Sequence, residues 1–255
     1  AFRGLSNVVL QGQTLAPMPD SYLALFNNYI PDPFGKEGFN LICFVVGIIV
    51  CIVYVALVMK NRADRAKKGY SVEAFGGTAV KMVLICAVVL AFMFRLAQYK
   101  GIPTALVWVA LVVLIYGYIT SKTTTGRYFY AVGGNEKATK LSGINTNKVY
   151  FIAYTNMGFL AALAGMLTIA RMTSAQPTYG QNYEMDAIGA CFVGGASAYG
   201  GVGTVPGVIV GAVLMGVINL GMSIMGVDAN YQKVVKGLVL LAAVIFDVVT
   251  KKQDK

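Results

Sequence analysis

The stretch GRYFYAVGGNEKATKLSGINTNKV, residues 126–149, lies between two long apolar runs and decides how the rest of the chain is interpreted. It is polar, basic and punctuated by glycine. Within it, Asn135 is a suitable N-cap, Glu136 places an anion in a first helical turn, and Gly143 suits the left-handed position that follows a helix. The pattern therefore predicts a helix of about two turns over Glu136–Ser142.

The two faces of this predicted helix differ in character. Ala138 and Leu141 lie three residues apart on one face, and Lys137 and Lys140 project from another. A helix this short is not stable alone, so we expect packing to hold it.

The composition indicates a membrane protein. Hydrophobic residues make up 57% of the 255 residues and charged residues 13%, against about 25% charged residues in soluble domains. A soluble core of this size would show amphipathic helices with charged faces, which these segments lack. Apolar runs close to the length needed to span a bilayer, about 20 residues, recur at 39–59, 82–99, 103–120, 150–170, 205–226 and 234–249.

The basic residues predict the orientation. Most of the 21 lysines and arginines fall in segments 60–81 and 121–149 and in the tail at 251–255, and we expect these three regions to face the cytoplasm. The net charge of +10 is therefore interpreted as a topology signal, not as a nucleic-acid-binding surface.

The number of membrane crossings agrees with this orientation only if residues 186–203, DAIGACFVGGASAYGGVG, also cross the membrane. The segment is short and rich in small residues, so we expect a broken or closely packed helix among others. Gly207 and Gly211 add a GxxxG pair that favours close helix packing. The total is about seven spanning or half-spanning elements.

The first 38 residues are expected to contain no complete span. Residues 1–10 are too short to cross a bilayer and look like the end of a helix, so we interpret the chain as an N-terminally incomplete portion. Four prolines make 11–38 a structured outer loop, which either touches a periplasmic binding protein or is a passive connector.

A resemblance adds to this interpretation. The chain is similar to the permease subunits of bacterial ABC importers for ribose, galactose and xylose in the order and spacing of five regions: GRYFYAVGGNEKATKLSGIN (126–145), SAQP (174–177), DAIGA (186–190), GGAS with GGVG (194–203) and YQKVVKG (231–237). The match is dense over about residues 100–255. FRGL (2–5) with GQT (12–14) resembles the xylose and multiple-sugar branch.

The resemblance implies a coupling role for the cytoplasmic loop 121–149, in which the helix near Glu136 docks on a separate ATPase subunit. The residues expected to form this coupling site are Gly133, Gly134, Asn135, Glu136, Ala138, Leu141 and Gly143. The implied partners are a second permease subunit, as a homodimer, a cytoplasmic ATP-binding subunit, a periplasmic sugar-binding protein and the lipid bilayer of the inner membrane.

Several absences narrow the function. The sequence has no G-x-x-x-x-G-K-[ST] loop for ATP phosphates, and without histidine it cannot form a Ser-His-Asp or Cys-His site. We expect no enzyme activity, no cofactor and no metal. Glu184, Asp186 and Asp247 lie near helix ends, where an acid is usually solvated, although a transport role stays open for each.

The sequence therefore predicts an all-α polytopic bundle, one permease domain over residues 1–255, that passes a monosaccharide, xylose or a related pentose or hexose, across the bacterial inner membrane. The alternative is a secondary sugar transporter or channel that is not coupled to an ATPase, which would normally need ionisable residues inside the membrane. Side chains that line the path, or else make ordinary helix–helix hydrogen bonds, are Thr155, Asn156, Ser197 and Asn219.

Overall fold

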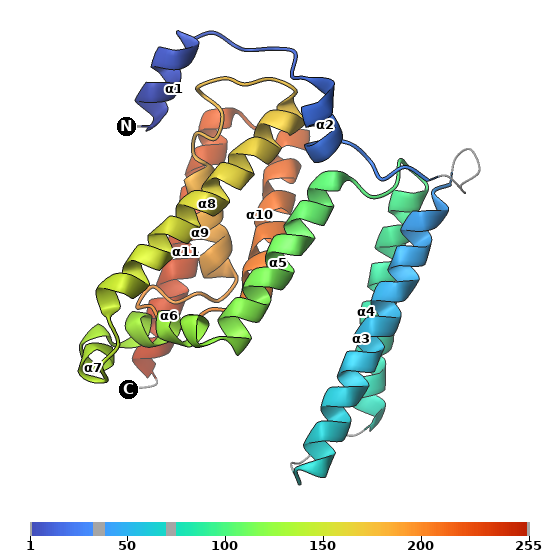
Figure 1. The fold of residues 1–255 in the computed structure, drawn as a ribbon, viewed down its shortest axis with the longest axis vertical. Helices are drawn as coiled ribbons and strands as arrows, with labels where there is room; N and C mark the ends of the chain where they lie inside the picture. Colours follow the sequence, from blue (N-terminus) through green and yellow to red (C-terminus); the bar gives the residue numbers. More distant parts are fainter. Residues whose placement is uncertain (1, 33–38, 70–74, 254–255) are drawn as a thin grey trace. The chain divides into compact units, whose positions relative to one another are not determined.

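A computed structural model describes residues 2–32, 39–69 and 75–253. Within these ranges the regular structure is helical, with two isolated β-bridges and no strand, which confirms the predicted all-α class. The helices are α1 (Phe2–Leu10), α2 (Asp20–Phe26), α3 (Leu41–Lys67), α4 (Phe75–Ala97), α5 (Thr104–Lys122), α6 (Thr124–Gly134), α7 (Glu136–Leu141), α8 (Thr146–Met172), α9 (Tyr183–Val193), α10 (Val205–Ile224) and α11 (Ala229–Gln253) (Figure 1).

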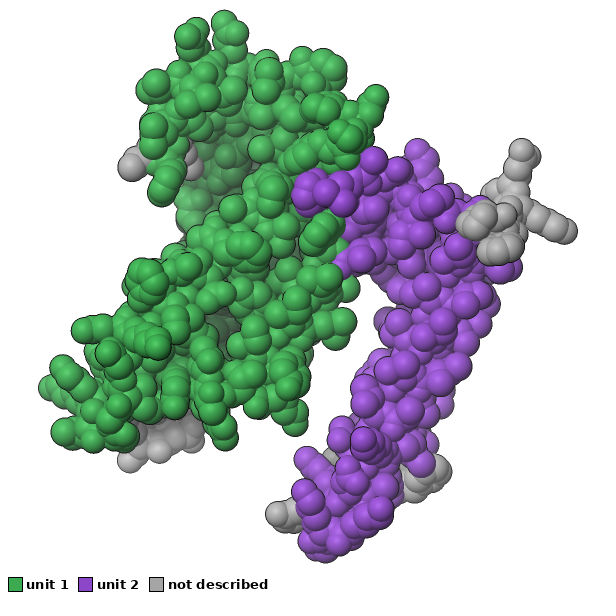
Figure 2. Space-filling view, viewed as in Figure 1, with its two compact units in different colours: residues 1–23, 108–255 green, residues 24–107 purple. Residues whose placement is uncertain are grey.

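The chain divides into two compact units, residues 24–107 and residues 1–23 together with 108–255 (Figure 2). The smaller unit is built on the pairing of α3 with α4. Cys43, Ala97 and Ile102 are buried at one end of this pair. Asn40 caps α3 by accepting a hydrogen bond from the Cys43 N–H at 2.9 Å, and its own N–H donates to the Ala97 carbonyl at 2.8 Å.

The larger unit contains α6 to α11 and most of α5. α9 packs against both α10 and α11, and α6 lies crosswise at one end of these helices, next to α7 (Figure 1). At the other end, Leu15 and Ala175 exchange two backbone hydrogen bonds of 2.9 Å. Tyr22 donates its hydroxyl to the Met166 carbonyl at 2.7 Å, and burial raises the pKa of Tyr22.

Among the described residues, five helices are long and apolar enough to cross a membrane: α3, α4, α5, α8 and α10. Their large apolar side chains point outward: Leu114 on α5 and Phe151 on α8 are both 73% exposed. Such surfaces suit contact with lipid or with other helices of a membrane assembly. α11 has 25 residues but is not among these helices, and it carries Lys233, Lys236 and Asp247.

Residues 186–203 form a short helix followed by a loop, in agreement with the broken helix expected there. α9 has 11 residues, about 16 Å in length and roughly half of a bilayer core. Residues 194–204, here named the α9–α10 loop, continue without helix toward α6. In the segment 11–38 the described residues form the short α2 and no span, as expected, while residues 33–38 lie outside the described part.

Candidate functional site

The helix predicted over Glu136–Ser142 is present as α7, which ends at Leu141. The side-chain oxygen of Asn135 accepts a hydrogen bond from the Ala138 N–H at 3.0 Å, and Glu136 lies in the first turn. Gly143 follows with a φ of +81°, in the left-handed region that favours glycine. Both predicted helix ends are therefore confirmed.

Contacts with neighbouring helices hold this six-residue helix. Tyr150 on α8 donates its hydroxyl to Glu136 Oε2 at 3.1 Å. Thr139 is buried, and its hydroxyl donates to the Asn135 carbonyl at 2.8 Å. A helix of one and a half turns is unstable alone, so packing on α6 and α8 must fix the position of α7.

The outward face of α7 is free for a partner. Leu141 is 89% exposed, and Lys137, Ala138 and Lys140 are exposed as well. We name these four residues the α7 surface. A single exposed leucine is ordinary on a protein surface, so the geometry makes the α7 surface available without identifying what binds it.

Sequence reasoning did not predict α6. Thr123 caps it by accepting a hydrogen bond from the Gly126 N–H at 3.2 Å, and Val132 on the helix is buried. Three glycines and two threonines lower the helix propensity of Thr124–Gly134, so tertiary packing determines this helix. The N-capping residue Thr123 was the local signal that could have found it.

The end of α6 lies directly against the α9–α10 loop. A Cβ atom on Gly200 would lie 2.5 Å from the Gly133 carbonyl oxygen, and one on Gly133 would lie 2.7 Å from the Gly201 nitrogen. Only residues without a Cβ allow two backbones this close. Tyr130 adds a hydrogen bond of 2.8 Å from its hydroxyl to the Gly203 carbonyl.

The same loop is bonded to α11 on its other side. Asp247 Oδ2 accepts hydrogen bonds from Ser197 Oγ at 3.1 Å and from the Ala198 N–H at 3.0 Å. Asp247, expected to be solvated as an acid near a helix end, instead fixes the loop. The α9–α10 loop is thus held between α6, which leads into α7, and the end of α11.

The predicted close approach at Gly207 and Gly211 is also present. A Cβ on Gly207 would collide with the Gly194 carbonyl, and one on Gly211 would collide with the Ala190 carbonyl. α9 and α10 therefore meet backbone to backbone, as small residues allow in membrane helices.

Two of the four predicted pore-lining residues lie on α8. Thr155 is exposed and donates its hydroxyl to the Phe151 carbonyl of its own helix at 2.8 Å. Asn156 accepts a hydrogen bond of 2.9 Å from the Tyr116 hydroxyl on α5. Their contact with a sugar stays a prediction.

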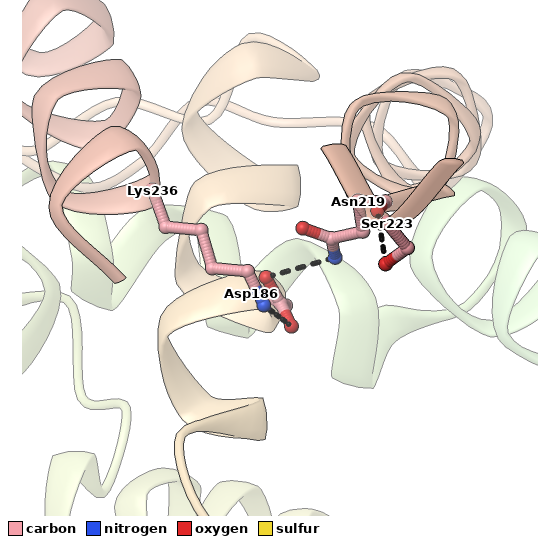
Figure 3. A network of polar contacts seen from close by, with 4 residues as sticks. All are labelled: Asp186, Asn219, Ser223 and Lys236. Carbon is pink, nitrogen blue, oxygen red and sulfur yellow. Dashed lines mark hydrogen bonds and ion pairs between the residues drawn. The ribbon is translucent and has the colours of Figure 1, made fainter. Parts of the chain in front are cut away.

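The other two are Ser197, in the α9–α10 loop, and Asn219, on α10. Asn219 belongs to a polar network with Asp186 of α9 and Lys236 of α11 (Figure 3). Lys236 Nζ lies 2.8 Å from Asp186 Oδ2, and Asn219 Nδ2 donates to Asp186 Oδ1 at 3.2 Å. The side chains of Lys236 and Asp186 are 16% and 25% exposed. Asn219 Oδ1 is buried and has no hydrogen-bond partner among the described residues.

The sequence did not lead us to predict that Lys236 belongs to this network. Asp186 was expected to be a solvated acid near a helix end, and Lys236 was noted only as part of the run 231–237. The signal was nevertheless present, because Lys236 falls inside the predicted span 234–249. A cation inside a spanning helix generally has an acidic partner facing the bundle interior.

This chain is similar to several transport permeases. The family profile described as the permease component of the branched-chain amino acid transport system matches residues 25–244. The xylose transport system permease protein of Haemophilus influenzae is 36% identical over 253 residues, which cover 99% of this chain and 65% of that protein. The ribose import permease protein of Escherichia coli is 41% identical over 200 residues, which cover 71% of this chain and 62% of that protein.

A third relative, the xylose transport system permease protein of Escherichia coli, is 32% identical over 254 residues. The alignment covers all of this chain and 63% of that protein. This chain therefore spans less than two thirds of the length of these relatives. No solved structure matches it significantly. The resemblance to sugar permeases drawn from the sequence is confirmed.

Proposed function

We propose, because this chain belongs to the family of branched-chain amino acid transport system permease components, that it forms the membrane part of an ATP-driven importer for a pentose. Membership in this family and the long apolar helices identify the chain as part of a multi-pass membrane protein. The observation that carries the proposal is the agreement with a xylose permease over 99% of the chain. Xylose and ribose, named in the relatives, are the sugars to test first.

In this proposal a separate ATPase supplies the energy. The chain lacks a phosphate-binding loop, so ATP must be bound elsewhere. The α7 surface is the place where the ATPase docks, with Leu141 and Ala138 packing and the two lysines at their sides. Support comes from the exposure of Leu141 and from the capped, tethered position of α7.

Movement of α7 would be transmitted to the membrane helices through two contacts of the α9–α10 loop. Gly133 and Gly134 of α6 lie on the α9–α10 loop, and Asp247 ties that loop to α11. A ligand shifts a conformational equilibrium only by its differential affinity for the two states. In this proposal two ATPase subunits dock on the two permease copies and close on each other when they bind ATP. ATP binding would therefore favour the arrangement of α6 and the loop that fits the closed ATPase pair.

The remaining partners complete the transporter. Two copies of the full protein would form the pore in the bacterial inner membrane, with residues 121–149 in the cytoplasm and a periplasmic sugar-binding protein on the outer loops. Sugar selection would lie mainly in that binding protein. Both compact units would belong to one permease domain.

The test is reconstitution of the full-length protein in lipid vesicles with its ATPase and its binding protein. Labelled D-xylose and D-ribose are supplied on the binding-protein side and ATP on the other. We expect accumulation of at least one of the two sugars with ATP, and none with a non-hydrolysable ATP analogue. The permease without ATPase should neither accumulate sugar nor hydrolyse ATP.

Two results would reject the proposal. Accumulation at an equal rate without ATPase, driven by an ion gradient, would identify a secondary transporter. Failure of the ATPase to bind the protein, with correctly folded subunits, would remove the coupling on which the proposal depends.

A further inference from the structure

We infer that Asp186, Asn219 and Lys236 form a contact site for the hydroxyl groups of the sugar in transit, named here the outer polar site (Figure 3). The inference rests on the proposed function and adds to it a place inside the membrane part where the cargo is held briefly. A sugar would meet this site on the side opposite α6 and α7.

The position of the three residues supports this inference. Asp186 lies three residues after the start of α9, Lys236 seven residues after the start of α11, and Asn219 five residues before the end of α10. At a rise of about 1.5 Å per residue, all three lie within about 11 Å of the helix ends expected to face outward. Three different helices thus bring polar groups to one level, and both charged side chains are partly exposed.

The ion pair joins α9 to α11, whereas α9 and α10 meet without it, through backbone contacts at Gly194 with Gly207 and at Ala190 with Gly211. Replacement of an ion pair that is mostly removed from water by apolar residues is often neutral or stabilising, because taking two charges out of water is expensive. Ionisable residues inside a membrane bundle therefore point to function more than to stability.

The hydrogen-bonding capacity of the site fits a neutral polyol. Asn219 Oδ1 is a buried acceptor with no partner among the described residues, and such an atom is rare without a ligand or water to satisfy it. Lys236 Nζ has three donors, of which Asp186 takes one. In a conformation that uncovers the amide oxygen, a sugar hydroxyl can donate to it and accept from the ammonium group. Since the charges of Asp186 and Lys236 cancel, the site should favour an uncharged ligand over an ion.

The test uses the reconstituted full transporter with Asn219→Leu, which removes the amide and keeps the side-chain size. Ser223→Ala is the matched control, because the Ser223 hydroxyl donates at 2.9 Å to the Asn219 backbone carbonyl and takes no part in the ion pair. Uptake of D-xylose and D-ribose is compared with uptake of their 2-deoxy and 3-deoxy derivatives, each at a concentration that saturates the binding protein. Membrane abundance and ATPase activity are matched first.

We expect Asn219→Leu to slow uptake of the parent sugar about fivefold, the effect of one lost neutral hydrogen bond. One deoxy derivative, lacking the hydroxyl that Asn219 contacts, should be slowed much less. Ser223→Ala should leave all rates unchanged. Should Asn219→Leu fail to reach the membrane, Asn219→Ala removes the same oxygen without added bulk and carries the same expectation.

Equal slowing of every sugar, or no slowing at all, would overturn the inference and make the network a structural clamp. The proposed function fails differently: the unmodified transporter would then show no ATP-dependent uptake of either pentose. That result appears before any variant is made, and it would overturn the inference together with the proposed function.

Discussion

Alanine substitutions at Gly133 and at Gly134 should have opposite effects, although the two glycines are neighbours at the end of α6. A Cβ on Gly133 would lie 2.7 Å from the Gly201 nitrogen, whereas a Cβ on Gly134 would meet nothing within 4 Å. Both changes gain the same helix propensity, up to about 1 kcal/mol for glycine to alanine. The difference between the variants therefore isolates the contact with the α9–α10 loop.

The size of that difference follows from the crowding. The Cβ atom that Gly133→Ala adds would face backbone, which cannot rotate away as a side chain can, and overpacking of this kind costs about 1–3 kcal/mol. Gly134→Ala should be neutral or stabilising by up to about 1 kcal/mol. A difference of about 1 kcal/mol shifts the Tm by about 2–4 °C in a domain of 150–250 residues and by less in a larger protein, so Gly133→Ala should melt measurably below Gly134→Ala.

The assay is thermal unfolding of the full-length protein in detergent, followed by sugar uptake in vesicles at matched protein levels. Gly133→Ala should also slow uptake, because it displaces the loop from the helix that leads into α7. Equal Tm values for the two variants would refute the reasoning, since the loop would then not rest on α6 at Gly133.

Three further predictions concern the loop 121–149 and its orientation. Gly143→Val should slow sugar uptake and weaken binding of the ATPase at normal membrane abundance, because the φ of +81° disfavours a β-branched residue by about 1–2 kcal/mol. Gly143→Asn should keep most activity, since asparagine tolerates this conformation. Asn135→Ala should lose about 1 kcal/mol of capping and speed amide exchange over 136–141 about fivefold, and unchanged exchange would contradict the cap. An impermeant thiol reagent applied outside intact cells should label Thr178→Cys and leave Thr124→Cys unlabelled, and the reverse pattern would invert the topology.

Local features of the fold could be predicted from the sequence because their signals lie within a few residues. Asn135, Glu136 and Gly143 define α7 through capping and a left-handed position, and the structure has these features. The broken element at 186–203 followed from its length and small residues. Each of these arguments needs only neighbours along the chain.

The contacts that join distant segments could not be predicted in the same way. Gly133 and Gly200 are both glycines in glycine-rich stretches, and no signal in the neighbouring sequence indicates that they touch. The partner of Lys236 is 50 residues away on α9, so the pair becomes visible only once α9 and α11 are packed. α6 was missed because its stability comes from this packing and not from its own residues.

Docking of an ATPase on α7 can be tested by cross-linking. A photoreactive amino acid replaces Leu141, which is 89% exposed, in the full-length protein assembled with its ATPase and binding protein. A second variant carries the same group at Thr178, an exposed residue in the loop before α9. We expect a covalent adduct between position 141 and the ATPase subunit, and no ATPase adduct from position 178. Absence of an ATPase adduct from position 141, or an equal yield from both positions, would contradict docking at α7.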